Sequence, residues 1–230
     1  MKKILFLLLL IHSNSFSQVM GGSESTINSQ FATLSRDISS QESMKNMSFD
    51  GNKYFYDDFE FGDIYLSDGK KPISVKTNYN ILTETFDIEN KKGEVGLALI
   101  PNKINSIKFE KHTFIVFMGN FFQLITENDT FSIIKSIKLI AVEQEYQPGI
   151  QDVPNLIYRK NDELFLKYKS NKKLIKRNRK SFVAMFSPSK QGEIKKFIKK
   201  NKISVRDDQE IKLLFDTCLL YTSDAADELR

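Results

Sequence analysis

Short apolar runs, each closed by turn residues, fill the chain from residue 51 to residue 168. Runs of about four to eight residues with turn signals between them are typical of antiparallel β-strands. Asp68 and Gly69 separate two such runs, and both residue types tolerate the positive φ that a hairpin turn demands. We therefore expect an antiparallel meander that forms an open sheet, a sandwich or a barrel. The expected strands cover residues 59–66, 73–79, 85–89, 94–99, 104–109, 113–118, 121–126, 131–142, 156–160 and 163–168.

The apolar period changes to that of a helix after residue 186. Apolar residues recur three and four positions apart over 193–201, with lysines on the other side. This spacing predicts a helix that ends at Asn201, with its start capped by residues 187–189. A second helix is expected to begin near residues 206–208, because acidic residues suit a helix N-terminus. The expected fold class is thus mainly β with C-terminal helices, a β-rich α+β fold.

The first 17 residues have the pattern of a secretory signal peptide. Two lysines precede an apolar run over 4–11, and the small residues Ser15 and Ser17 follow it. This apolar run is too short to span a bilayer as a helix, which takes about 20 residues. We expect cleavage after Ser17, no transmembrane segment in the mature chain, and export to the periplasm or the cell exterior.

The composition divides the rest of the chain into four parts. Residues 18–50 are polar and form an expected spacer with one short helix over 31–38. Residues 51–186 form the expected β domain and 187–217 a truncated helical segment. Residues 218–230 resemble the translation of a transposase-type sequencing adapter, so we expect the native sequence to stop near Thr217.

The expected mature sequence, residues 18–217, holds no cysteine and one histidine, His112. This composition argues against thiol chemistry and histidine-rich metal sites, and we expect no cofactor. A lone histidine between two expected strands is more typical of a turn or edge residue than of a base or ligand.

A basic run is the sharpest candidate for a binding site. Its cations suit a polyanion or an anionic membrane surface, whereas nucleic acid is not an expected partner of an exported protein. The alternative is a solvated hairpin whose lysines protect an edge strand from aggregation. The candidate anion-binding residues are Lys167, Lys169, Lys172, Lys173, Lys176, Arg177, Arg179 and Lys180.

Acidic and aromatic residues gather before and within the first expected strand. A carboxylate pair drawn from Asp57, Asp58 and Glu60 would suit glycoside hydrolysis, although such carboxylates are usually just solvated. The aromatic residues of segment 54–65 are interpreted as core and rim, with a ligand-stacking surface as the alternative. We expect no catalytic residue here.

Three segments, 51–59, 62–69 and 79–81, resemble a family of uncharacterised exported proteins of Bacteroidetes. Residues 193–203 are similar to the terminal helix of that family, whereas 85–89 depart from its usual order. The resemblance implies an exported protein and lends no activity or catalytic residue. We therefore expect a non-enzymatic module that binds an envelope protein or an anionic envelope surface. The alternatives are an acid-pair hydrolase acting on glycans and a polyanion or membrane-surface binder that uses residues 167–180.

Overall fold

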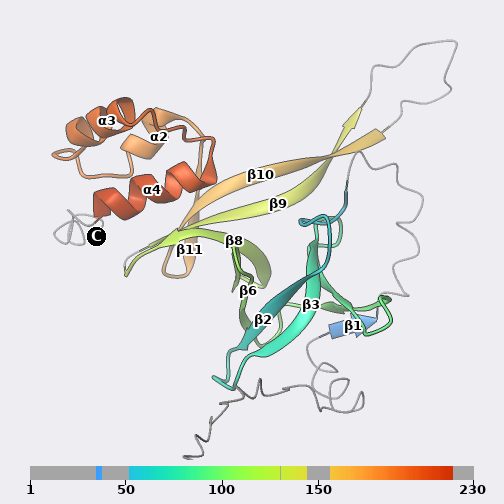
Figure 1. The fold of residues 1–230 in the computed structure, drawn as a ribbon. Coiled ribbons are helices and arrows are strands. Elements are labelled where there is room, and N and C mark those ends of the chain that lie inside the picture. Colours follow the sequence, from blue (N-terminus) through green and yellow to red (C-terminus); the bar gives the residue numbers. More distant parts are fainter. Residues whose placement is uncertain (1–34, 38–51, 130, 144–155, 220–230) are drawn as a thin grey trace, which may run out of the picture.

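In the described part of the chain, eleven antiparallel strands form one open sheet, and helices follow it at the C-terminal side in the computed structural model (Figure 1). The structure describes residues 35–37, 52–129, 131–143 and 156–219. The mainly β class with C-terminal helices is confirmed, and of the three expected architectures the open sheet is the one observed. The strands are β1 (Ser35–Asp37), β2 (Glu60–Leu66), β3 (Ile73–Asn80), β4 (Thr85–Glu89), β5 (Val95–Leu99), β6 (Ile104–Lys108), β7 (Thr113–Phe117), β8 (Asn120–Glu127), β9 (Ser132–Glu143), β10 (Leu156–Tyr168) and β11 (Asn171–Ile175). The helices are α2 (Arg179–Val183), α3 (Gln191–Lys200) and α4 (Asp208–Leu219).

The sheet consists of two meanders joined at one point. Strands follow the order β1-β5-β4-β3-β2-β6-β7-β8-β9-β10-β11, so β6 pairs with β2 and not with β5. Ile104 of β6 lies opposite Leu66 of β2, and the Ser67 amide donates a 2.9 Å hydrogen bond to the Lys103 carbonyl. The expected meander is therefore interrupted once, between β5 and β6.

The sheet curls strongly around an aromatic core that both meanders share. Phe86 of β4 and Phe121 of β8 have ring centroids 5.0 Å apart. These strands lie five positions apart in the sheet order, which would separate them by about 24 Å in a flat sheet. Phe114 and Tyr79 also contact Phe86, with ring centroids 5.0 and 5.1 Å away. The buried aromatic rings therefore hold the curved sheet together, although the sheet does not close into a barrel.

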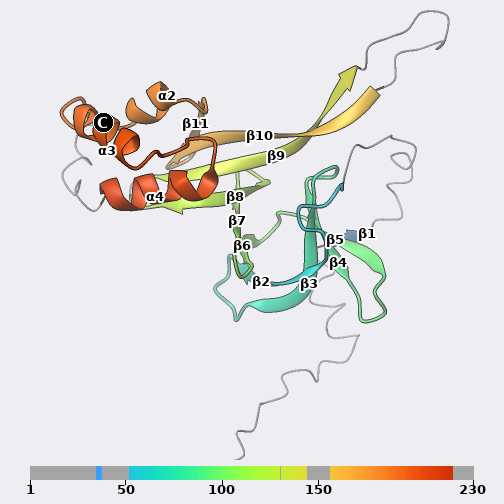
Figure 2. The ribbon, with the colours of Figure 1, turned by 45° about the horizontal axis from the view of Figure 1, so that its top comes forward.

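A second apolar cluster lies beneath the helices, on the same face of the sheet. Ile133 of β9 belongs to this cluster, whereas Ile137, four residues further along the strand, belongs to the aromatic core. Figure 2 shows α4 lying along β8 and β9 at the helical end of the molecule. Residues of the helices that complete the cluster include Phe182, Ile194, Ile198, Ile211, Leu214 and Phe215.

At two positions the structure shows why the residue is a glycine. Gly69 has φ +71° in the β2–β3 turn, which confirms the expected hairpin. A Cβ atom on Gly62 of β2 would lie 3.0 Å from the Phe109 ring, so a side chain there would displace the aromatic core.

The expected turn between residues 160 and 163 is wrong, because β10 is one continuous strand. Asn161 and Asp162 stay in register with Lys138 and Ile137 of β9. The Asn-Asp pair lacks a glycine for a tight turn, and the Asp162 carboxylate is neutralised by Arg177.

Two local expectations outside the meander also need correction. Residues 35–37, placed in a short helix over 31–38, instead form β1 and pair with the free edge of β5. Helix α3 begins after Lys190, which makes no side-chain cap, although its end before Asn201 is confirmed. Residues 187–190 form a turn in which the Ser187 carbonyl accepts from the Lys190 and Gln191 amides.

Helix α4 begins where the acidic residues predict. The Asp207 carboxylate accepts hydrogen bonds from the Gln209 and Glu210 amides at 2.8 and 3.1 Å. The helix continues through Leu219, so the first two residues of the adapter-like segment are helical. The remainder of that segment, the expected signal peptide and most of the spacer lie outside the described residues.

Candidate functional site

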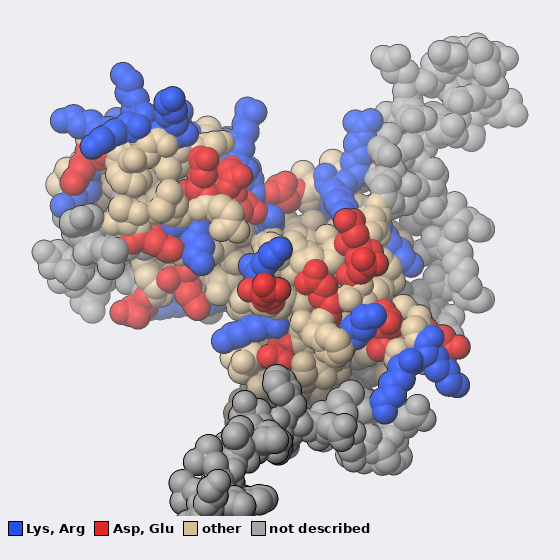
Figure 3. Space-filling model, in the orientation of Figure 1, with Lys and Arg blue, Asp and Glu red and all other residues tan. Residues whose placement is uncertain are grey.

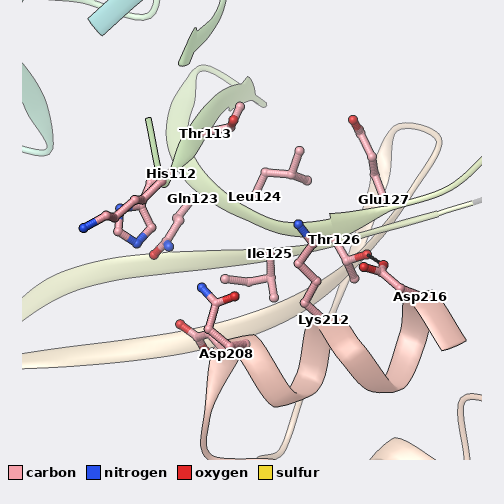
Figure 4. A pocket seen from close by; sticks show the side chains of 12 residues that line it. His112, Thr113, Gln123, Leu124, Ile125, Thr126, Glu127, Asp208, Lys212 and Asp216 are labelled. Carbon is pink, nitrogen blue, oxygen red and sulfur yellow. Dashed lines mark hydrogen bonds between the residues drawn. The ribbon is translucent and has the colours of Figure 1, made fainter. Parts of the chain in front are cut away.

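A cleft of about 290 Å³ lies between strand β8 and helix α4 (Figure 4). Lys212 and Asp216 follow Asp208 at successive four-residue steps, so one side of α4 faces the strand. The opposite side of α4 buries Ile211 and Leu214 in the apolar cluster. The cleft is lined by Lys111, His112, Thr113, Gln123, Leu124, Ile125, Thr126, Glu127, Asp208, Gln209, Lys212 and Asp216.

A bulge in β8 shapes the strand side of the cleft. The register against β9 shifts between Leu124 and Thr126, and such a bulge re-aims the side chains around it. The Thr126 hydroxyl then donates a 2.9 Å hydrogen bond to the Asp216 carboxylate of α4. This bond joins the two walls of the cleft (Figure 4).

Gln123 is the most unusual residue of the cleft. Only 5% of this residue is exposed, and its Oε1 atom has no hydrogen-bond partner among the described residues. A buried amide oxygen without a partner destabilises the folded state by about 1–3 kcal/mol. The residue is therefore poorly explained by the stability of the ligand-free protein alone.

His112 lies beside the cleft in a half-buried position between β6 and β7. Its Nδ1 atom is 2.9 Å from the Tyr56 hydroxyl, and the Phe55 ring packs edge-on against the imidazole. Burial, followed by the nearby Lys135 charge, lowers the pKa of His112, so the ring is neutral at pH 7. Burial and the charge of Glu60 raise the pKa of Tyr56.

The bond to Tyr56 leaves one ring nitrogen of His112 free for the cleft. Because Tyr56 keeps its proton, its hydroxyl is both a donor and an acceptor, and it bonds Nδ1 in either tautomer of the neutral imidazole. Nε2 is the ring nitrogen left for a ligand, as a donor in one tautomer and an acceptor in the other. His112 fits the expected place between two strands, and it also lines a cleft that the sequence did not predict.

A charge network forms the floor at the start of α4. Asp208 is bridged to both Lys135 and Arg177, with Arg177 Nη2 2.9 Å from Asp208 Oδ1. Burial alone would raise the pKa of Asp208, but the hydrogen bonds and charges of Lys135 and Arg177 outweigh it and lower that pKa. Arg177 also bridges Asp162 and donates to the Arg206 carbonyl. Asp208 is thus a neutralised structural carboxylate.

The candidate anion-binding residues do not form one hairpin surface. The segment extends from the end of β10 through β11 into α2, where Asn178 caps the helix by accepting from the Ser181 amide. Arg177 is held between two carboxylates and is not available to a ligand. The exposed members are Lys169, Lys172, Lys173, Lys176, Arg179 and Lys180, and Lys167 is half-buried.

Two of these lysines lie over aromatic rings on the face of the sheet away from the helices. Lys167 and Lys172 are directly opposite each other on β10 and β11. The Lys172 ammonium lies 4.5 Å from the centre of the Phe122 ring and 4.7 Å from that of Phe165. Such contacts hold a cation in place and cover apolar surface.

The exposed cations of α2 and α3 form a second basic feature, here called the basic helical surface. Figure 3 shows Lys and Arg side chains gathered over this end of the molecule. None of its six members forms a salt bridge with another described residue. They are Arg179, Lys180, Lys195, Lys196, Lys199 and Lys200. The same helix α3 buries Ile194 and Ile198, so its apolar side packs on the protein.

The acidic and aromatic candidates lie elsewhere. Asp57, Asp58 and Glu60 are all exposed and do not line the cleft. Phe55 and Tyr56 pack against the aromatic core, as the core-and-rim interpretation predicts, while Phe61 is 67% exposed.

The cleft was missed because it joins residues about 90 positions apart in the chain. The available signal was the polar pair Gln123 and Thr126 among the apolar residues in the middle of β8. Among the described residues, no group of His, Cys, Asp and Glu side chains is arranged to hold a metal ion. Within the same residues, no helix has both the length and the apolar character needed to cross a membrane.

No protein-family model, curated protein or solved structure matches the sequence.

Proposed function

We propose that this chain is an exported, non-enzymatic binding module that docks on an anionic surface of the bacterial envelope. The signal-peptide pattern of residues 1–17 and the resemblance to exported proteins of Bacteroidetes support export to the periplasm or beyond. The basic helical surface supports the anionic partner, and it is the observation that carries the proposal.

The unpaired state of these cations matters more than their number. A lysine in a surface ion pair has its field largely cancelled, whereas each cation of the basic helical surface keeps its own. Clustered cations near an anionic membrane contribute about 1 kcal/mol each to binding. The buried Ile194 and Ile198 fix α3 on the protein, so the lysines dock from a rigid support and the helix does not insert.

Charge reversal tests this proposal. A variant with Lys195, Lys196, Lys199 and Lys200 each changed to Glu should lose most binding to vesicles that contain phosphatidylglycerol. Binding of the native chain should also fall steeply between about 0.1 M and about 1 M salt, because the Debye length shrinks from about 10 Å to about 3 Å. Co-sedimentation with anionic and with purely phosphatidylcholine vesicles measures both effects.

The matched control reverses four exposed lysines in the turns of the first meander. Lys70, Lys71, Lys91 and Lys92 carry the same total charge outside the basic helical surface. The control should bind within about twofold of the native chain at about 0.1 M salt. Salt-independent binding would contradict the proposal, because it would show that charges do not drive the binding. Equal loss in both variants would show that net charge, and not the basic helical surface, is responsible.

A further inference from the structure

The cleft between β8 and α4 contains a buried hydrogen-bonding group with nothing to bind. Gln123 is 5% exposed and its Oε1 atom lacks a partner among the described residues. Buried polar groups in folded proteins are nearly always satisfied, and a persistent exception points to a ligand or water.

The neighbouring groups define what such a ligand must offer. The Gln123 oxygen needs a donor, and His112 Nε2 needs an acceptor in one tautomer and a donor in the other. A hydroxyl group donates and accepts, so it satisfies both. A carboxylate or a fully ionised phosphate only accepts, and it would leave the Gln123 oxygen unpaired.

The charges around the cleft favour an uncharged ligand. Lys111 and Lys212 are balanced by Glu127 and Asp216, and Asp208 is neutralised by its two salt bridges. The volume of about 290 Å³ lies at the lower end of the range of small-molecule sites. These properties match one compact, polar molecule.

We propose that this cleft binds a small uncharged ligand rich in hydroxyl groups, of the size of a monosaccharide. Gln123 Oε1 accepts from one ligand hydroxyl, and His112 Nε2 forms a hydrogen bond with another. Lys212 and Asp216 of α4 close the opposite side (Figure 4). The site is separate from the basic helical surface, so either proposal stands without the other.

Nuclear magnetic resonance of the isotope-labelled full chain tests the site directly. Glucose, galactose, mannose and N-acetylglucosamine are titrated separately at millimolar concentration, with sodium acetate and sodium phosphate as anion controls. We expect at least one sugar to shift, saturably, the amide signals of residues 111–113 and 123–127 and the side-chain amide of Gln123. No shift with any sugar, or the same shifts with acetate or phosphate, would overturn the proposal.

Substitution of the amide separates binding from structure. Gln123→Met keeps the length of the side chain and removes the unpaired amide, so it should abolish the sugar-induced shifts and raise the unfolding temperature of the ligand-free protein. Gln191→Met is the matched control, since Gln191 bonds the Phe186 carbonyl outside the cleft and should leave sugar binding unchanged.

A second variant guards against a folding defect in the first. His112→Phe keeps an aromatic ring beside Phe55 and removes the hydrogen-bonding Nε2 atom, so it should weaken sugar binding by about tenfold. Native affinity in either Gln123→Met or His112→Phe would overturn the assigned roles.

Discussion

At the scale of single residues, the cleft shows that some polar side chains on its strands find a hydrogen-bond or ion-pair partner and others do not. Thr126 pairs with Asp216 of α4, and Lys135 on the neighbouring strand pairs with Asp208. Gln123, three residues before Thr126, has an unpaired amide oxygen. The sequence reveals these polar residues on strands, but it does not reveal which of them α4 satisfies. That distinction depends on contacts about 90 residues apart along the chain.

Asp208 gives a prediction about stability and pH. The carboxylate joins Lys135, whose side chain is 12% exposed, to Arg177, which also bridges Asp162. Asp208→Asn leaves both cations without their carboxylate, so the free energy of unfolding at pH 7 should fall by roughly 2 kcal/mol, between the surface and fully buried cases. Chemical denaturation at a series of pH values measures the difference.

The pH dependence of that difference follows from the lowered pKa of Asp208. A carboxylate with a lowered folded pKa stabilises the protein above its unfolded pKa of about 4, and this contribution disappears as the pH falls through the folded value. The gap between native chain and variant should therefore close in acid. Asp68→Asn, which removes an exposed pair with Lys70, serves as the control and should change nothing measurable. Equal stability of Asp208→Asn and the native chain at pH 7 would contradict the structural role of the network.

At the scale of elements, the sequence predicted most strands, but it did not predict the continuous strand through residues 160–163 or the helix that follows β11. Alternating apolar residues and Gly-containing turns locate β2 to β9 to within one or two residues. The Asn161-Asp162 pair suggested a turn, but the hydrogen-bonded ladder with β9 runs through it without a break, and Asp162 forms an ion pair with Arg177. The solvated-hairpin alternative for the basic run fits β10 and β11, which pair with each other. It does not fit the last residues of the run, which form α2 behind the cap at Asn178.

Helix α4 should be held mainly by one aromatic residue. Phe215 is fully buried, stacks on Phe186 at 5.2 Å, and contacts Phe131 and Phe182. Phe215→Ala should lower the free energy of unfolding by about 3–5 kcal/mol, since it removes a large buried ring and leaves a cavity. Leu213→Ala lies on the same helix at a position that is 51% exposed and should stay within about 0.5 kcal/mol of the native chain. Similar losses in both variants, measured by urea denaturation, would mean that α4 is not anchored through Phe215.

At the scale of the whole molecule, the curl of the sheet lies beyond what local patterns can predict. Strand positions follow from alternation and turn residues, but the choice of β2 over β5 as the partner of β6 is a non-local decision. It depends on Phe86, Phe114 and Phe121 meeting across strands that are far apart in the sheet order. The sequence identifies these residues as apolar and strand-forming without indicating which of them meet.

The two apolar clusters should nevertheless unfold together, because β9 belongs to both. Ile133 packs beneath the helices and Ile137 packs in the aromatic core, on one face of one strand. Phe86→Ala removes a fully buried ring from the core alone and should cost about 3–5 kcal/mol. If unfolding is cooperative, amides of α4 should lose the same protection from hydrogen exchange as amides of β4, roughly a hundredfold or more.

Hydrogen exchange read residue by residue distinguishes the two outcomes. Val95→Ala, at a position that is 37% exposed on β5, provides the control and should leave protection in both clusters nearly unchanged. If Phe86→Ala lowers protection only in β2 to β5, the helical end is an independent folding unit. Strand β8 is shared in that case, because Phe121 packs in the aromatic core whereas Ile125 packs beneath the helices. If protection falls everywhere, the aromatic core and the helical end form one cooperative unit, and the cleft between β8 and α4 is lost only when the whole molecule unfolds.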